Sequence, residues 1–263
     1  MKDSGVEKTR ASEYVALLPA AGTGSRLPDR LLSKELLPYG GANGDGSPVI
    51  SHILSCLHQA GVREVIVVIR KGKSDIPDYL SGGEWEQTRF SYKITPGTSG
   101  VPETVALGLQ DACGRRVAFG FPDILFKPKG AFVKLMRRLE TSEADVVLGL
   151  FPTNNPSKFD MVNTDDNGRV TDIEIKPQST PLELTWILAA WEPSFSTYLK
   201  ALTQGSPGRL EALARESGGS HLGHAFQLAM ADGLLIESES FTEGRSLDIG
   251  TPDDLALARA WTY

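Results

Sequence analysis

The residue types most suited to binding and catalysis in this sequence occur in a glycine-rich loop and in three cationic residues that follow it. Gly22-Thr23-Gly24-Ser25 follows an apolar run, and Arg26, Arg30 and Lys34 come soon after it. Small residues let backbone N–H groups approach an anion, while Arg and Lys bind phosphate as a planar fork and as a point charge. The loop favours phosphate or nucleotide binding, with Arg30 expected in solvent. A tight turn after a buried strand is the purely structural alternative.

Two named phosphate-binding motifs are not present in this loop. The dinucleotide fingerprint GxGxxG needs a third glycine where Leu27 stands, so a dinucleotide dehydrogenase is disfavoured. The sequence contains no GxxxxGK[ST], which excludes a P-loop.

The loop and the segment after it resemble the sugar-1-phosphate nucleotidyltransferases, or NDP-sugar pyrophosphorylases, which include glucose-1-phosphate thymidylyl- and uridylyltransferases. The resemblance lies in GTGSR at residues 22–26, KELLP at 34–38 and LDIGTP at 247–252. It covers roughly residues 14 to 260. The family resemblance implies an enzyme with a Rossmann-like nucleotidyltransferase fold.

The resemblance also implies roles for the residues of the loop. Arg26 and Lys34 match the catalytic cations that contact the triphosphate and the transferring phosphoryl group. Thr95 stands where the family has a glutamine that reads the pyrimidine, so the choice of base stays open. The full set of implied nucleotide-binding residues is Ala20, Ala21, Gly22, Thr23, Gly24, Ser25, Thr95 and Gly100.

Two aspartates match the family's magnesium ligands. Asp123 follows Pro122, which replaces the usual glycine, and Asp248 lies in LDIGTP. Carboxylate oxygens suit magnesium, and the carboxyl edge of an α/β sheet can bring together acids that are distant in sequence. The structural alternatives are a turn aspartate at 123 and a helix-capping aspartate at 248.

The acceptor-binding residues depart from the family pattern. Phe159-Asp160 replaces a tyrosine–glycine pair, and Ile175 replaces the acid of an E-K-P motif that keeps Lys176 and Pro177. The resemblance assigns Asp160 and Lys176 to acceptor binding. The departures leave open an acceptor other than a hexose phosphate.

The elements that must position these residues alternate between strand and helix in the first half. The apolar patterns predict an α/β fold with a mostly parallel central sheet, helices on both faces and a smaller inserted hairpin around Asp166-Asn167-Gly168. Strands are expected at 14–19, 64–70, 90–94, 116–121, 144–151, 159–165, 169–176, 184–191 and 234–240. Helices are expected at 48–60, 102–112, 129–140, 194–202, 209–216, 223–231 and from 252, where Thr251-Pro252 gives a start signal.

A polar tail at 1–13 is expected to precede one nucleotidyltransferase domain at 14–263. Within that domain, residues 14–151 are expected to bind the nucleotide and 152–245 the acceptor, while 246–263 carry the second metal aspartate and a closing helix.

The composition excludes several other classes of protein. The net charge of −6 disfavours a nucleic-acid surface, and no apolar run is long enough for a membrane span. Cys56 and Cys113 predict two buried thiols in a cytoplasmic protein, and His52, His58, His221 and His224 are expected on the surface or in packing.

The predicted reaction joins a nucleoside triphosphate to a sugar 1-phosphate, giving an NDP-sugar and pyrophosphate with the help of Mg²⁺. Its partners are therefore a nucleoside triphosphate and a phosphorylated small molecule, with neither nucleic acid nor membrane, and a homo-oligomer is the family default. One alternative is a cytidylyltransferase acting on phosphocholine or methylerythritol phosphate. Another is a sugar-nucleotide-binding regulatory module without turnover.

Overall fold

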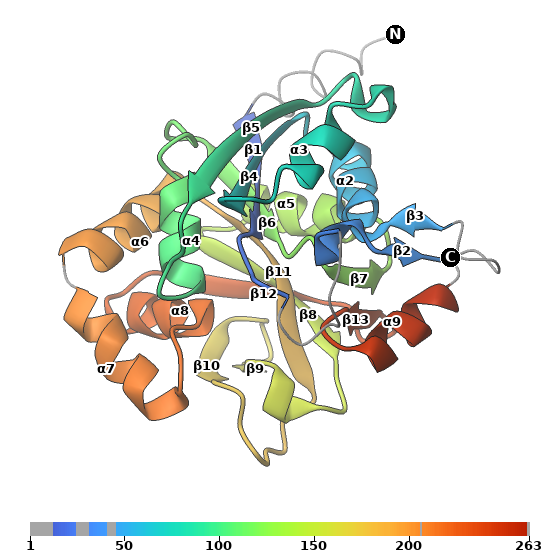
Figure 1. The fold of residues 1–263 in the computed structure, drawn as a ribbon. Helices are drawn as coiled ribbons and strands as arrows, with labels where there is room; N and C mark the ends of the chain where they lie inside the picture. The colour runs from blue at the N-terminus through green and yellow to red at the C-terminus, as the bar shows by residue number, and fades with distance from the viewer. Residues whose placement is uncertain (1–12, 25–31, 41–45, 206, 262–263) are drawn as a thin grey trace, which may run out of the picture.

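A nine-stranded sheet runs through the part of the chain that the computed structural model describes, residues 13–24, 32–40, 46–205 and 207–261. Its strands are β1 (Tyr14–Ala20), β4 (Glu64–Arg70), β5 (Arg89–Thr95), β6 (Arg116–Gly120), β8 (Val146–Pro152), β9 (Met161–Thr164), β10 (Val170–Glu174), β11 (Leu184–Trp191) and β12 (Ile236–Ser240). Their order is β10-β9-β11-β6-β1-β4-β5, with β8 also paired to β11 and β12 to β8 (Figure 1).

The sheet changes direction between β6 and β11. Strand β1 is parallel to β4 and β6, and β4 is parallel to β5. Strand β11 is antiparallel to β6, β8 and β9. The prediction of a mostly parallel central sheet is therefore confirmed in the first half, where β1 and β4 read as continuous apolar runs because both of their faces are covered.

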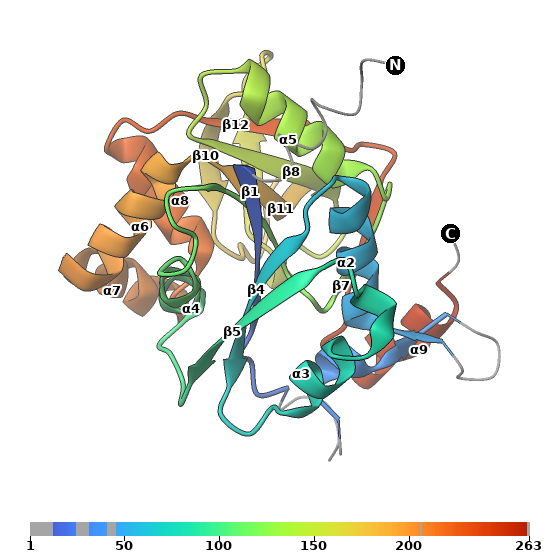
Figure 2. The same ribbon diagram turned by 90° about the horizontal axis from the view of Figure 1, so that it is seen from above.

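Helices cover both faces of this sheet, as Figures 1 and 2 show. One face packs against α2 (Val49–Gln59), α3 (Asp75–Leu80) and α5 (Ala131–Thr141). The other packs against α4 (Val101–Gly108), α6 (Pro193–Gly205), α7 (Pro207–Ser217) and α8 (Leu222–Ala231). Alternate side chains of β1 enter the two cores: Tyr14, Ala16 and Leu18 face the first, and Val15 and Leu17 the second.

Two short ribbons lie beside the sheet and were not expected from the sequence. Strand β2 (Pro38–Tyr39) pairs with β3 (Ser47–Pro48), and β7 (Ile124–Lys127) pairs with β13 (Arg245–Asp248). The predicted last helix is present as α9 (Pro252–Arg259), and the hydroxyl of Thr251 caps it by accepting from the Asp254 N–H at 3.2 Å. Short 3-10 helices occur at η1 (Lys34–Leu36), η2 (Gly83–Trp85) and η3 (Pro156–Lys158).

One expectation about the thiols is wrong. Cys56 is buried in α2, but Cys113 is exposed because it sits in a tight turn after α4 with a φ of 52°. In the described ranges, no helix combines the length and apolar character that crossing a bilayer would require.

Candidate active site

A cavity of about 190 Å³ lies beside the junction where β6 and β11 run in opposite directions. It brings together five residues that the sequence assigned to the site: Lys34, Asp123, Asp160, Lys176 and Asp248. Phe121, Lys158, Phe159, Trp186 and His221 also line it and were not assigned a role from the sequence.

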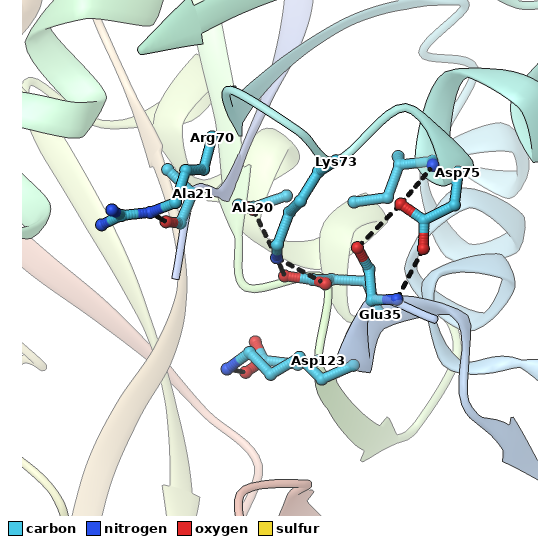
Figure 3. A network of polar contacts seen from close by, with 10 residues as sticks. Ala20, Ala21, Glu35, Arg70, Lys73, Asp75 and Asp123 are labelled. Carbon is cyan, nitrogen blue, oxygen red and sulfur yellow. Dashed lines mark hydrogen bonds and ion pairs between the residues drawn. The ribbon is translucent and has the colours of Figure 1, made fainter. Parts of the chain in front are cut away.

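Lys34 and Asp123 form an ion pair at one end of the cavity. Lys34 lies in η1, Asp123 follows β6, and the Lys34 Nζ donates a hydrogen bond to Asp123 Oδ2. Burial lowers the pKa of Lys34, but Asp123, Glu35 and Asp248 outweigh it, so that its pKa is raised above the ordinary value. Lys34 is therefore a fixed positive charge at neutral pH. Figure 3 shows Asp123 on the side of Glu35 that faces away from Asp75 and Lys73.

The β7–β13 ribbon places the second aspartate beside the first. Asp248 pairs with Ile124 in this ribbon, and the Ile249 N–H donates to the Asp123 carbonyl at 3.0 Å. Both carboxylates thus belong to the Lys34 end of the cavity, although the two residues are far apart in the sequence.

Two carboxylates suit a magnesium ion that phosphates help to hold. In the described residues, no cluster of three or more His, Cys, Asp or Glu side chains could hold a metal by itself. Magnesium, however, is commonly bound through one or two carboxylates together with substrate phosphates and water. Asp123 and Asp248 therefore fit this cation.

The glycine loop leaves the carboxyl end of β1 and lies against Lys34. An added Cβ at Gly22 would sit 3.8 Å from Lys34 Cε, and one at Gly24 would sit 3.9 Å from Lys34 Cβ. Gly24 has a φ of +63°, a conformation that favours glycine. Ala20, Ala21 and Thr23 belong to the same described stretch, whereas Ser25 and Arg26 lie outside the described residues.

Gly100 and Thr95 do not line the cavity, although Val101, the neighbour of Gly100, does. Gly100 precedes α4, and a Cβ there would come within 2.5 Å of the Ser220 carbonyl oxygen, so a larger residue would separate α4 from the segment before α8. Thr95 is buried, and its hydroxyl closes a turn by donating to the Gly97 carbonyl at 3.0 Å and accepting from the Gly97 N–H at 3.1 Å.

At the other end of the cavity, two buried polar atoms are without a hydrogen-bond partner in the described structure. They are Asp160 Oδ1 and Trp186 Nε1, on side chains that both line the cavity. Burial raises the pKa of Asp160 to about 6, although Lys176 opposes this shift. The Trp186 indole also opposes this shift, so the two side chains lie close together and place an acceptor and a donor in the same wall of the cavity.

The packing of α8 explains why Ile175 stands where the family's E-K-P motif has an acidic residue. A Cβ at Gly223 would lie 2.6 Å from both Asp160 Oδ2 and Ile175 Cδ1, so the glycine lets α8 pack directly against these side chains. Ile175 joins the core beneath α8, and the next residue, Lys176, turns to the cavity with a φ of 43°. Such a backbone conformation is uncommon outside glycine.

The histidines fall into two groups. His52 and His224 are buried packing residues; His52, for example, accepts from the Phe126 N–H at 3.1 Å. His221 lines the cavity at the start of α8, and burial, Lys176 and His224 lower its pKa to about 4. It therefore offers a neutral imidazole, which the expectation of surface or packing histidines missed.

A family of known proteins matches almost the whole chain. The sequence model described as Nucleotidyl transferase matches residues 15–260.

Individual relatives share less than a third of their residues with this chain in the aligned regions. The low-salt glycan biosynthesis nucleotidyltransferase Agl11 of Haloferax volcanii is 29% identical over 252 residues, which cover 92% of this chain and 64% of that protein. The chain thus spans just under two thirds of that relative. A glucose-1-phosphate thymidylyltransferase of Xanthomonas campestris pv. campestris is 24% identical over 264 residues, covering 93% of this chain and 87% of the relative.

The fold is also similar to a solved structure of UDP-glucose pyrophosphorylase complexed with UDP-glucose. The TM-score is 0.78 at 18% identity, and the match covers 93% of this chain and 96% of the other.

Proposed function

The chain belongs to the nucleotidyl transferase family, and from this premise we propose that it joins a nucleoside triphosphate to a sugar 1-phosphate, releasing pyrophosphate. The observation that carries the proposal is one cavity with two different ends. Lys34, Asp123 and Asp248 form the phosphate end, and Asp160 and Lys176 form the acceptor end. The named relatives act as nucleotidyltransferases, one of them on glucose 1-phosphate.

The proposed reaction is an in-line substitution at the α-phosphorus. A phosphate oxygen of the acceptor forms the new P–O bond while the bond to the β-phosphate oxygen breaks, and the electron pair leaves with pyrophosphate. The acceptor phosphate is already an anion near neutral pH, so no general base or covalent intermediate is needed. The enzyme contributes positioning and charge stabilisation.

Lys34 has the charge and position for this task. Its ammonium group stays protonated because nearby carboxylates outweigh its burial, so it can stabilise negative charge on the triphosphate. We assign Arg26 to the same triphosphate from the sequence resemblance. The N–H groups of Ala20 to Gly24 would face the phosphates or the nucleoside, with Thr95 and Gly100 on the base side, and Ser25 is assigned to the same nucleotide from the sequence resemblance.

Asp123 and Asp248 would hold the magnesium ion, which when bound supplies positive charge to phosphate oxygens. Lys176 would hold the acceptor phosphate, and Asp160 would accept a hydrogen bond from an acceptor hydroxyl. In this assignment residues 14–151 serve the nucleotide and 152–245 the acceptor, as the sequence predicts.

A phosphocholine acceptor is the second candidate. Phe121 and Trp186 stand with ring centroids 5.8 Å apart in the cavity wall, near the Asp160 carboxylate. Aromatic faces and a carboxylate attract a quaternary ammonium group. The Asp160 carboxylate and the Trp186 indole N–H favour the hydroxyl-bearing sugar, since a trimethylammonium group can neither donate to the one nor accept from the other.

The test is pyrophosphate release with Mg²⁺ from ATP, GTP, CTP, UTP and dTTP, each offered glucose 1-phosphate, mannose 1-phosphate, N-acetylglucosamine 1-phosphate, phosphocholine or methylerythritol phosphate. Release with a sugar 1-phosphate is expected. Release only with phosphocholine or methylerythritol phosphate would replace the sugar by that acceptor. Nucleotide binding without release from any pair would indicate a regulatory module.

A further inference from the structure

Two cations outside the cavity reach back to the carbonyl groups at the end of β1. Arg70 ends β4, and its Nε donates to the Ala21 carbonyl at 3.1 Å. Lys73 lies in the turn before α3, and its Nζ donates to the Ala20 carbonyl at 2.8 Å. Figure 3 shows both side chains directed at the start of the glycine loop.

These contacts fix the direction of the loop amides. A trans peptide is planar, and its N–H points away from its C=O. With the Ala20 and Ala21 carbonyls held by Lys73 and Arg70, the N–H groups of Ala21 and Gly22 must point to the opposite side. The direction of an amide decides whether it can donate to a phosphate.

Lys73 also holds the segment that carries Lys34. Its Nζ lies 2.9 Å from both carboxylate oxygens of Glu35, a side chain with no exposed surface. Burial raises the pKa of Glu35, and Lys73 is the strongest opposing influence. The same ammonium group therefore bonds to the loop and to the neighbour of Lys34.

The residue on the other side of Lys34 is held by the same segment. Asp75 accepts hydrogen bonds from the Ser33 N–H at 2.5 Å and from the Ser33 hydroxyl at 2.9 Å (Figure 3). Residues 33 and 35 are thus both fixed by residues 73–75. A 3-10 helix of three residues has few hydrogen bonds of its own, so these contacts set where the Lys34 backbone lies.

We propose that Lys73 is a positioning residue for nucleotidyl transfer, acting on the loop amides through Ala20 and on Lys34 through Glu35, with Arg70 supporting the loop alone. The proposal rests on the proposed function. A buried ion pair is often replaceable by an apolar pair without loss of stability. The charge at residue 73 is thus better explained by the geometry it imposes than by stability.

The experiment compares Lys73→Met, the apolar double variant Glu35→Leu/Lys73→Met, and Lys93→Met. Lys93 is the control because it forms an ion pair of the same 2.9 Å length with Asp111, more exposed than the Lys73 pair, and bonds to neither Ala20 nor Glu35. Each variant is measured for thermal stability, for binding of UTP and dTTP with Mg²⁺, and for kcat and KM of pyrophosphate release. Arg70→Met is included to separate the loop contact from the Glu35 contact.

Lys73→Met is expected to weaken triphosphate binding and to lower kcat by about 10–100-fold, the cost of a displacement near 1 Å, while the acceptor KM stays within about twofold. The double variant should recover melting temperature without recovering kcat, and Lys93→Met should match wild type. Arg70→Met should reduce triphosphate binding and kcat less than Lys73→Met does. Recovery of kcat together with stability in the double variant, or a wild-type kcat in Lys73→Met, would overturn the proposal.

The binding measurement separates this inference from the proposed reaction. If wild type binds UTP or dTTP but turns over no acceptor, the reaction is wrong while the effect of Lys73→Met on binding still decides the positioning role. If wild type binds neither these two nor the other triphosphates, both ideas fail.

Discussion

Lys34 is the residue on which the proposed phosphate end of the cavity depends. Burial disfavours its charge, yet Asp123, Glu35 and Asp248 keep its pKa raised. We expect Lys34→Ala to reduce kcat/KM by about 10²–10³-fold, the usual loss for one preorganised charge. The measurement is steady-state pyrophosphate release, with circular dichroism to verify folding. A loss below about threefold would remove Lys34 from the reaction.

In the proposed function, Asp160 links acceptor binding to pH. Its pKa is raised by burial from 3.8 to about 6, so folding favours its protonated form. The stability that protonation contributes is complete below pH 4 and is lost as the pH rises through about 6. At pH 7.5 the charged form costs about 2–3 kcal/mol relative to a neutral side chain of the same shape.

Asp160→Asn is therefore expected to be more stable than wild type at pH 7.5, and the difference should vanish near pH 4. Because the carboxylate is assigned to an acceptor hydroxyl, the acceptor KM should rise by about tenfold or more. Urea denaturation at several pH values and acceptor kinetics check both parts. Equal stability at all pH values would contradict the raised pKa.

At the scale of elements, helix α8 packs against the proposed acceptor end through Gly223. A methyl group there would meet Asp160 and Ile175 at 2.6 Å. We expect Gly223→Ala to destabilise the protein by about 1–3 kcal/mol and to raise the acceptor KM without changing the triphosphate KM. Gly205→Ala is the control, because its Cβ would enter open space. Wild-type acceptor binding in Gly223→Ala would exclude α8 from the acceptor site.

The elements that the sequence predicts well are those with long apolar patterns. The strands β4 and β11 have the expected bounds, and α2 differs by one residue at each end. The β7–β13 ribbon was missed because strands of four residues carry almost no periodicity and their pairing is remote in sequence. It is nevertheless the ribbon that brings Asp248 to Asp123.

Among the candidate site residues, those that belong to recurring motifs could be predicted to share a cavity. Lys34, Asp123 and Asp248 are in this group. Trp186 and His221 had no such signal, because an aromatic residue in a strand and a histidine before a helix are usually packing residues. Only the tertiary structure shows that they face the same cavity as Asp160.

Ligand binding should be visible in the stability of the whole molecule. The cavity is walled by segments from both halves of the sheet, from Lys34 to Asp248, so a ligand there holds them together. At a hundred times its dissociation constant, a triphosphate with Mg²⁺ should add about 2.7 kcal/mol. The melting temperature should rise by several degrees in scanning calorimetry. Lys34→Ala should show a smaller rise, and no rise in wild type would contradict binding at this cavity.

The reversal of strand direction between β6 and β11 means that separate segments of the chain supply the two groups of cavity residues. Phe121 and Asp123 follow the end of β6, whereas Trp186 belongs to the beginning of β11, and the two groups meet only because these neighbouring strands are antiparallel. The segments flanking hairpin β9–β10 and the start of helix α8 contribute to the proposed acceptor side. Under the proposed function, substitutions in these segments would change the acceptor while the nucleotide-binding residues are retained, so that one scaffold could diversify its products in separate evolutionary steps.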